Sequence, residues 1–379
     1  MAMIVDRIIS PGSKLSCSAG MHPDSTLVLF DVSSSFYTGK KSSLVRHGYS
    51  RDHRRDRPQI VYGLLCDPEG RPIAVAVFPG NTADPKAFTS IVAEVRKRFG
   101  ITNLVFVGDR GMITTKRIEE DLRDVEGLEW ISALRTEGIR SLMDAGKIPR
   151  TLVAATQRKR QPLQGEDAIG LAVGQVIGDH KMKKHLELTI MENSFSYARR
   201  QDNITAEAAL DGLYVIRTCV TAERMNSDKV VMTYKSLAKV ERAFRSLKSI
   251  DLHIRPIRHR NDNRIRAHVF LCMLAYYVEW HMRAALRELI FDDDDLAGAQ
   301  ALRKSVVAKA KRSASAKQQD ATRRTPENLP VQSFQDLLKG MATLTRNSIC
   351  FESSASVFNQ LTESTPWQRR VLELLSTHA

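Results

Sequence analysis

Two apolar segments that each lead into an aspartate constrain the fold of this chain more than any other feature. The segment Thr26–Ser34 predicts a buried strand that ends in a carboxylate, Asp31, which small hydroxyl residues follow. The segment Asn103–Val107 predicts another strand, and Asp109 follows it in a glycine-rich turn. Each aspartate alone fits a helix cap or a turn as well as an active-site acid, so the order of the surrounding elements has to decide.

The order of these elements predicts an α/β fold. The apolar patterns and turn signals give three consecutive antiparallel strands, a helix, a strand, a second helix and a short strand. The other expected strands are Gln59–Cys66, Pro72–Phe78 and Glu129–Leu134, and the two helices begin at Asp84 and Thr115. This order is the ribonuclease-H-like arrangement, a mixed sheet flanked by helices. Its first and fourth strands are neighbours, and two carboxylates about 4 Å apart repel each other unless a divalent cation neutralises them.

A third acidic candidate lies on a predicted helix over Tyr234–Lys248. The helix has an apolar stripe and, beside it, a face on which one carboxylate is flanked by a phenol and two cations. The stripe consists of Leu237, Val240, Phe244 and Leu247, and the polar face consists of Tyr234, Glu241, Arg245 and Lys248, within about 60° of one another. Taken alone, this window is better explained as an ordinary amphipathic surface helix, because charged helix faces are common.

The segment between Asp109 and Glu241 is too long for one helix–strand–helix connection, which predicts an inserted unit of nearly domain size. The stretches 185–191 and 212–219 alternate like strands, so we expect the insertion to be partly β. The predicted organisation is an N-terminal arm (1–23), the first part of a catalytic domain (24–137), the insertion (138–224), the C-terminal helices of the catalytic domain (225–290), an acidic and then basic linker (291–330) and a C-terminal tail (331–379).

Several stretches beyond Glu241 are expected to be loops or linkers. A basic linker over Ile254–Arg266 precedes a long apolar helix, His268–Leu286. Asp292–Asp295 is best explained as a solvated loop, and Ala301–Arg324, which has few large apolar residues, as a flexible basic linker.

The charge of the chain indicates an anionic partner. The net charge is +14, which favours nucleic acid, with a membrane surface as the competing explanation. From Tyr234 to Arg266 ten Lys and Arg residues stand against three acidic ones, a density that fits a track for the phosphate backbone. The chain has no apolar run of about 18 residues, no secretion signal and five scattered cysteines without a paired motif. We therefore expect a cytoplasmic protein without a membrane partner.

Asp31, Asp109 and Glu241 together form a candidate acidic triad on two strands and a helix. Three carboxylates with open coordination positions suit two Mg²⁺ ions, which prefer oxygen ligands and substrate phosphate. Such a pair of ions activates a water or a 3′-hydroxyl and stabilises the leaving oxygen of an in-line phosphoryl transfer. The surrounding Lys and Arg residues would hold the DNA backbone.

The sequence around these residues resembles the DDE transposases of bacterial insertion sequences, in the family-four-like group that has a β insertion before the glutamate. The matching text is LVLFDVSSSFYTG, GYSRDHRRDRPQIVYGLLCDPEGRPIAVAVFPGNTADP, LVFVGDRGMIT and YKSLAKVERAFRSLKSIDLHIRPIRHRNDNRIRAHVFLCMLAYYVEWHMR. The group has a Tyr-x2-Arg-x3-Glu-x6-Lys signature. Tyr234, Glu241 and Lys248 fill their places, whereas Leu237 stands at the arginine position, and Arg245 is expected to share the lost role.

The resemblance covers most of residues 24–350 and implies DNA cleavage and strand transfer during transposition of an insertion sequence. It implies Asp31, Asp109 and Glu241 as catalytic and metal-binding residues, with two Mg²⁺ ions for which Mn²⁺ substitutes. The implied DNA contacts are Tyr234, Arg245 and Lys248. The implied partner is double-stranded DNA, both element ends and target, bound by a homodimer at the bacterial nucleoid.

The sequence departs from the family pattern in two places. Family members have a helical DNA-binding region before the first catalytic strand, whereas here a short stretch that resembles its beginning leads almost directly to Asp31. The stretch around 157–164 is also shorter than expected. Both departures predict an internally deleted copy. The alternatives are therefore an inactive remnant that only binds DNA and another kind of ribonuclease-H-like nuclease, against which the Tyr-Glu-Lys helix argues.

Overall fold

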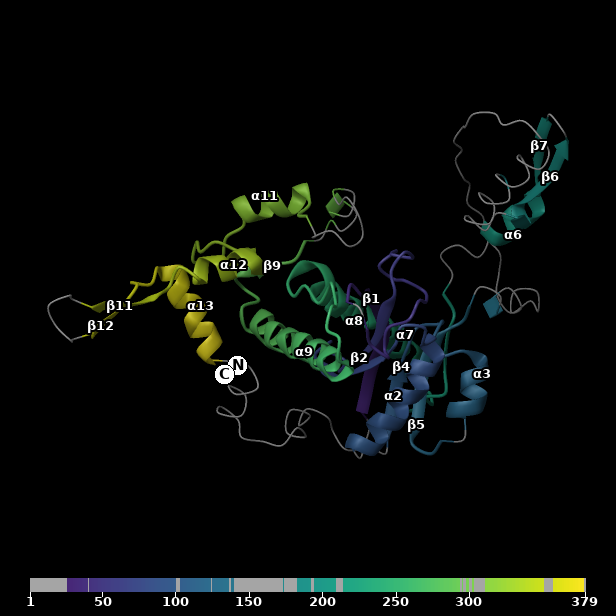
Figure 1. Cartoon of the computed structure of the whole chain (residues 1–379), viewed down its shortest axis with the longest axis horizontal. Helices are drawn as coiled ribbons and strands as arrows, with labels where there is room; N and C mark the ends of the chain where they lie inside the picture. The colour runs from purple at the N-terminus through teal and green to yellow at the C-terminus, as the bar shows by residue number, and fades with distance from the viewer. Residues whose placement is uncertain are drawn as a thin grey trace. The chain divides into compact units, whose positions relative to one another are not determined.

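The computed structural model of the chain describes most residues between 26 and 377. The described ranges are 26–39, 41–99, 103–123, 125–135, 183–191, 194–208, 214–293, 311–350 and 357–377, with a few isolated residues between them. The expectations for residues 1–23 and for the stretch 157–164 lie outside the described residues. Two compact units are present, Met1–Ser132 with Thr218–Ala379, and Ala133–Arg217 (Figure 1). The six-segment organisation inferred from the sequence stays a prediction.

A mixed six-stranded sheet with the order β3-β2-β1-β4-β5-β8 forms the centre of the fold. The strands are β1 (Thr26–Phe36), β2 (Gln59–Cys66), β3 (Pro72–Pro79), β4 (Leu104–Val107), β5 (Leu128–Ala133) and β8 (Ile216–Thr218). β2 is antiparallel to both β1 and β3, whereas β4 is parallel to both β1 and β5. The predicted α/β fold with a mixed sheet is therefore confirmed, including the pairing of the two strands that lead to Asp31 and Asp109.

Helix α2 (Asp84–Phe99) covers one face of this sheet (Figure 1). The ring of Phe88 lies against Phe30 of β1 and Phe106 of β4, with centroids 6.3 and 5.2 Å apart. The rings belong to a buried cluster to which strands β1 to β5 all contribute apolar side chains. Each fully buried side chain of this size stabilises the fold by about 2 kcal/mol, so this face is the main hydrophobic core.

Helix α8 (Leu237–Arg245) covers the opposite face, where Phe244 packs on Tyr62 of β2 with ring centroids 5.9 Å apart. In the β1–β2 register, Asp31 lies opposite Leu64, two residues from Tyr62. Side chains alternate along a strand, and directly paired residues point to the same face of a sheet. The side chain of Asp31 therefore lies on the face that α8 covers.

The sequence predicted one continuous helix over Tyr234–Lys248. This prediction is wrong, because the helix is interrupted. The elements are α7 (Ser227–Lys235), α8 and a π-helical turn, η4 (Ser246–Ile250). The hydroxyl of Ser236, between α7 and α8, donates to the carbonyl of Thr233 at 2.6 Å. Such local bonds from Ser compete with helical ones and favour helix ends. Tyr234 therefore lies on a different helix from Glu241.

Helix α9 (Asp262–Ala285) begins earlier than predicted. The side chain of Asn261 accepts a hydrogen bond from the backbone N–H of Asn263 at 2.8 Å, and Asn is a preferred residue at a helix start. The basic segment up to Arg266 is therefore a linker only as far as Arg260, because its last residues belong to the first turns of α9.

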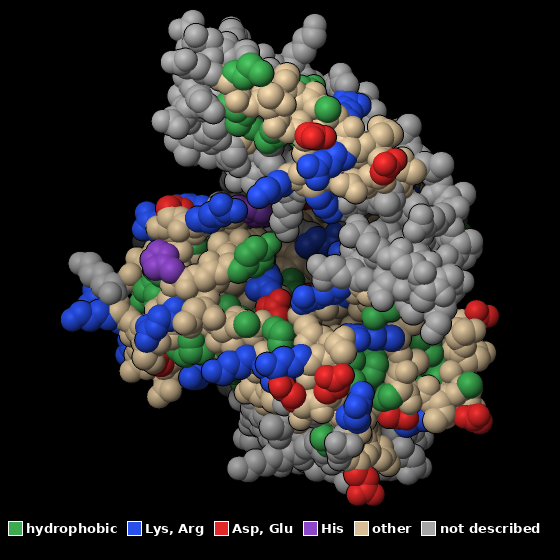
Figure 2. Space-filling model, turned by 90° about the vertical axis from the view of Figure 1, so that its right-hand side faces the viewer, with side chains coloured by type: hydrophobic (Ala, Val, Ile, Leu, Met, Phe, Trp, Pro, Cys, Tyr) green, Lys and Arg blue, Asp and Glu red, His purple; other side chains and the backbone are tan. Residues whose placement is uncertain are grey.

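Most cations of the segment 234–266 remain accessible to solvent. Three of the ten are partly buried, Arg245, Lys248 and Arg255. The exposed ones are Lys235, Lys239, Arg242, Arg258, Arg260, Arg264 and Arg266. On the face of the molecule drawn in Figure 2, Lys and Arg side chains outnumber Asp and Glu side chains. The positive net charge is thus displayed on the surface, where it attracts anionic partners.

The C-terminal part contains more structure than the sequence predicted. Its elements are β9 (Ile290–Phe291), α11 (Ala314–Thr322), β10 (Gln332–Ser333), α12 (Phe334–Met341), β11 (Arg346–Cys350), β12 (Val357–Leu361) and α13 (Pro366–Thr377). Helix α11 lies inside the stretch expected to be a flexible linker. The hydroxyl of Ser313 caps it by accepting the N–H of Ala316 at 3.0 Å. The cap and the burial of Ala316 explain why this polar segment is helical.

The acidic run that begins at Asp292 is not a purely solvated loop, which corrects the prediction for its first two residues. Asp292 forms ion pairs with Arg242 at 2.9 Å and Arg283 at 3.2 Å. Asp293 accepts hydrogen bonds from the backbone N–H and the hydroxyl of Ser313, at 2.9 and 2.7 Å. These carboxylates therefore connect the segment after β9 to α8, α9 and the start of α11.

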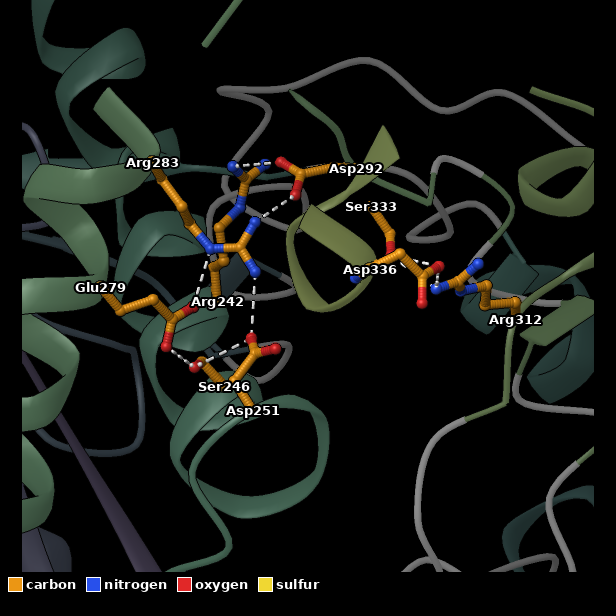
Figure 3. Close-up of polar contacts among 9 residues, drawn as sticks. All are labelled: Arg242, Ser246, Asp251, Glu279, Arg283, Asp292, Arg312, Ser333 and Asp336. Carbon is orange, nitrogen blue, oxygen red and sulfur yellow. Dashed lines mark hydrogen bonds and ion pairs between the residues drawn. The ribbon is translucent and has the colours of Figure 1, made fainter. Parts of the chain in front are cut away.

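Arg283 of α9 is the centre of a buried ion network (Figure 3). Its guanidinium donates to Glu279 at 2.7 Å and to Asp251 at 3.0 Å, and it lies 4.4 Å from the ring centroid of Phe334. The hydroxyl of Ser246 donates to Glu279 at 2.6 Å, and its oxygen lies 3.3 Å from Oδ2 of Asp251. The network joins η4 and α9 to α12, so it connects the part of the chain that carries Glu241 to the C-terminal helices.

The network makes stability depend on pH. Burial, followed by the charge of Asp251, raises the pKa of Glu279 from 4.5 to about 7, against the opposing effect of Arg283. The folded state therefore holds the Glu279 proton more tightly than the unfolded state does. This contribution to stability is complete below pH 4.5 and is lost as the pH rises through about 7.

The Glu279→Gln variant cannot ionise at this position. Between about pH 4.5 and 8, we therefore expect the free energy of unfolding of the wild type to fall by about 2 kcal/mol more than that of the variant. Urea unfolding at a series of pH values measures this difference. The matched control is Glu288→Gln, at an exposed position just after α9. A pH dependence identical in the wild type and the Glu279→Gln variant would contradict the assignment.

The smaller unit contains a β-hairpin and a helix among its described residues. The elements are the 3-10 turn η3 (Lys183–His185), β6 (Leu186–Met191), β7 (Ser194–Arg199) and α6 (Gln201–Ala208), with β6 and β7 antiparallel. The strand predicted at 185–191 is confirmed as β6. The strand expected over 212–219 is shorter than predicted and forms β8.

Candidate acidic active site

Asp31 lies on β1, partly buried, and its carboxylate is poorly solvated. The backbone N–H of Val32 donates to its Oδ1 at 2.7 Å. Burial raises the pKa of Asp31 to about 7, while the Val32 N–H and the charge of Arg51 lower it. The charges of Asp109 and Asp84 raise it further. A carboxyl group that is costly to ionise and faces other carboxylates is typical of a functional site.

Asp109 follows the end of β4, beside the part of β1 that carries Asp31. The strand β1 continues to Phe36, so the prediction that Asp31 ends its strand is wrong. In the parallel β1–β4 register, Leu29 pairs with Val107, and each aspartate comes two residues after its paired residue. The carbonyl of Asp109 accepts the N–H groups of Met112 and Ile113 at 2.9 and 3.2 Å, so the chain turns sharply here. The turn leaves the Asp109 side chain exposed to solvent.

Glu241 lies on α8, next to the buried positions Val240 and Phe244, and its own side chain is exposed. The helix packs against β1 and β2 on the face toward which Asp31 points. The apolar stripe predicted from the sequence is confirmed at Val240, Phe244 and Leu247, which are buried. Glu241 therefore lies on the helix that covers the Asp31 face of the sheet, and its own side chain faces solvent.

The described residues contain no group of three or more His, Cys, Asp or Glu side chains arranged to hold a metal ion. The structure brings Asp31 and Asp109 together electrostatically and leaves Glu241 outside this pair. The pair itself fits a hard cation, because the charge of Asp109 raises the pKa of Asp31 and a divalent ion would remove that repulsion. Carboxylate oxygens are also the ligands that Mg²⁺ prefers.

Two charged residues near Asp31 were not singled out from the sequence. Arg51 donates to Asp84 at the start of α2, with 2.6 Å between the guanidinium nitrogen and Oδ1. Both charges influence the pKa of Asp31, in opposite directions. In the sequence Asp84 indicates only the start of a helix, and Arg51 is one of several cations in the stretch 48–57.

Lys248 lies in η4 with a side chain that is 11% exposed, and its ammonium donates to Oδ1 of Asp52 at 3.0 Å. Arg255 donates to the same oxygen at 2.5 Å. Burial lowers the pKa of Lys248, and the charge of Asp52 opposes this effect. The buried Asp52 was missed, because in the sequence it is one acid inside a loop of cations.

The other two expected DNA contacts lie on α7 and α8. Tyr234 is the second-last residue of α7 and is partly buried. Arg245 is the last residue of α8 and is also partly buried. Arg245 lies on α8 four residues after Glu241, as the sequence predicted, whereas Tyr234 lies on α7, before the turn at Ser236.

The fold and these residues define an α/β protein with an acidic site on a mixed sheet, next to a strongly basic segment. The chain belongs to the family described as the transposase DDE domain, whose model matches residues 23–278. The transposase resemblance found in the sequence is therefore confirmed at the level of this family.

Among solved structures, the chain is similar to a piggyBac transposase in a cryo-EM structure of its synaptic complex with hairpin DNA. The sequence identity is 11% and the TM-score is 0.37, over 67% of this chain and 46% of that chain. The matched region thus spans less than half of the piggyBac chain. No curated protein matches the sequence. In the described part of the chain, no helix is both long enough and apolar enough to cross a membrane.

Proposed function

We propose that this protein is a DNA transposase that cleaves the ends of a bacterial insertion sequence and joins them to target DNA, with divalent metal ions. One observation carries the proposal. Within the region matched by the DDE family, β1 and β4 are parallel neighbours, and Asp31 and Asp109 each follow by two residues the pair Leu29–Val107, which supports the proposal. Two carboxylates in this relation are what a DDE enzyme requires of its first two acidic residues.

In this proposal Asp31, Asp109 and Glu241 hold two Mg²⁺ ions, for which Mn²⁺ substitutes. The bound ions supply Lewis-acid activation of the attacking oxygen and stabilisation of the leaving oxygen. Asp31 and Asp109 provide oxygen ligands from the sheet. Glu241 provides a third carboxylate from α8, on the face of the sheet toward which Asp31 points.

Double-stranded DNA is the proposed substrate, at the element ends and at the target. Tyr234, Arg245 and Lys248 would contact its backbone near the carboxylates. The exposed cations between Lys235 and Arg266 would extend the phosphate track, as their number and exposure support. Binding of this type weakens steeply as the salt concentration rises.

The finer assignments are part of the same proposal. The catalytic domain is ribonuclease-H-like, is formed by residues 24–137 and 225–290, and has an insertion at 138–224. The chain is a member of the family-four-like signature group. It acts as a homodimer that pairs two DNA ends at the bacterial nucleoid. The sheet order and the position of the hairpin β6–β7 between Asp109 and Glu241 in the sequence are consistent with these assignments.

The decisive experiment is a cleavage and strand-transfer assay on DNA that carries the element's own ends. We expect cleavage with Mg²⁺ or Mn²⁺ and none with EDTA, because two metal ions are required for the in-line transfer. Products are resolved on denaturing gels, and DNA binding is measured separately in Ca²⁺. Binding without cleavage under both metals would favour the alternative, an inactive transposase copy that only binds DNA.

A further inference from the structure

Asp52 is the most deeply buried charged group near the acidic site, with 2% of its surface exposed. Its Oδ1 accepts bonds from Lys248 at 3.0 Å and from Arg255 at 2.5 Å. Its Oδ2 accepts the backbone N–H of Phe36 at 3.0 Å. Three donors therefore satisfy one carboxylate, as burial of a charge requires.

The partners of Asp52 come from the elements that carry the candidate triad. Phe36 is the last residue of β1, the strand of Asp31. Lys248 lies in η4, which continues directly from α8, the helix of Glu241. Asp52 thus connects the strand of one candidate ligand to the helical segment of another. The loop is also fixed beside β1 by the N–H of Arg51, which donates to the hydroxyl of Ser34 at 3.1 Å.

Arg51, the neighbour of Asp52 in this loop, has an electrostatic effect on both Asp31 and Lys248. Arg51 influences the pKa of Asp31 and also that of Lys248, so its guanidinium lies within electrostatic range of both. Lys248 is joined to this loop through Asp52, and the loop is joined to β1 through the bond from Arg51 to Ser34.

The Lys248 ammonium has donors beyond the one that Asp52 uses. An ammonium has three N–H donors, and the bond to Asp52 occupies one of them. The Lys248 side chain also keeps 11% of its surface exposed. A phosphodiester is a singly charged anion with oxygen acceptors, so it matches the ammonium in both charge and hydrogen bonding.

We propose that Asp52 is a positioning residue that holds the Lys248 ammonium between β1 and α8, oriented to contact a phosphate of the bound DNA strand. The inference rests on the proposed function and adds to it a residue that does not itself touch DNA or metal. Without Asp52, Lys248 and Arg255 would lose the anion that holds both of them in place.

The test compares single-turnover DNA cleavage by Asp52→Asn, Lys248→Met and the double variant Asp52→Asn/Lys248→Met. We expect each single variant to cleave on the order of a hundredfold more slowly than the wild type, because misplacing a substrate-binding group has this size of effect. The double variant should be no slower than Lys248→Met, because Asp52 acts through Lys248. In Asp52→Asn the buried Lys248 ammonium has lost its anion, which can impair folding. The double variant lacks this ammonium, so it still tests the inference if Asp52→Asn folds poorly.

A pH profile separates positioning from a purely structural role. Lys248 faces Asp52, Arg255 and Arg51, and near this group the buried Tyr62 phenol stays neutral. Asp52→Asn removes the charge that opposes the lowering of the Lys248 pKa by burial, Arg255 and Arg51, so that pKa falls further. The cleavage rate of Asp52→Asn relative to the wild type should therefore fall as the pH rises from about 7 to 9. Replacing Lys248 by Arg in the same background should remove this fall, because a guanidinium stays charged.

Three results would overturn the inference. They are wild-type cleavage by Asp52→Asn, a double variant much slower than Lys248→Met, and a rate ratio that is constant with pH. If the wild type itself binds DNA but does not cleave it, the proposed function fails, and with it the role assigned to Lys248.

Discussion

Replacement of Asp31 by Asn is expected to reduce DNA cleavage by about 10³-fold or more, while DNA affinity stays equal or rises slightly. The amide is nearly isosteric but neutral, so it is a poor ligand for a hard cation. Affinity for DNA should not fall, because the substitution removes a negative charge near the phosphate backbone. Asp109→Asn and Glu241→Gln should have the same effect, and combinations should be no worse than the single variants, since the three act as a unit.

Cleavage is measured in a single turnover with Mn²⁺, and DNA affinity in Ca²⁺. The matched control is Glu373→Gln on α13, an exposed carboxylate outside the proposed site, which should cleave like the wild type. Folding of the Asp109 and Glu241 variants should be unaffected, because both side chains are exposed. Persistent nicking by Asp31→Asn would show that Asp31 is not a metal ligand.

Arg283→Met should lower the free energy of unfolding by about 3 kcal/mol. The substitution keeps the aliphatic part of the side chain but leaves Glu279 and Asp251, both shielded from solvent, without their shared cation. It also removes the guanidinium that stacks on Phe334, so α12 should detach from α9 more readily. Urea unfolding followed by tryptophan fluorescence reports this change, since Trp280 lies on α9 itself.

Arg287→Met is the control for this substitution, because Arg287 is exposed just after α9. Its free energy of unfolding should stay within about 0.5 kcal/mol of the wild type. Adding Glu279→Gln to Arg283→Met should recover part of the lost stability, since one unpaired buried charge disappears. Additive losses in the double variant would show that the two residues do not interact as the structure indicates.

The sheet could be predicted from the sequence because its signals are local. Strand β2 was predicted with its observed boundaries, because an unbroken apolar run ends in the turn signal that begins at Asp67. That the strands of Asp31 and Asp109 are neighbours followed from the order of the strands. The length of β1 did not, because β1 continues past Asp31 to Phe36. The helix of Glu241 was also visible, through its apolar stripe.

The remaining parts of the site could not be predicted, because they depend on contacts between distant segments. Asp52 is surrounded by cations in the sequence, which indicates a solvated loop, and only the fold brings Lys248 and Arg255 to it. The break at Ser236 was missed for a related reason, since a single hydroxyl bond ends α7 where propensity alone would continue it. Helix α11 was missed because its composition is polar and its stability comes from a cap.

The larger compact unit is discontinuous, since its two parts are separated in sequence by Ala133–Arg217. The ribosome therefore releases Asp31, Asp52 and Asp109 long before Glu241, Lys248 and Arg255. Until the later segment arrives, Asp52 has neither cation beside it, and burying its charge would cost several kcal/mol. The face of the sheet that receives α8 must stay open during synthesis, and contacts between such distant residues form slowly. The elements that carry Asp31 and Glu241 therefore come together late in folding.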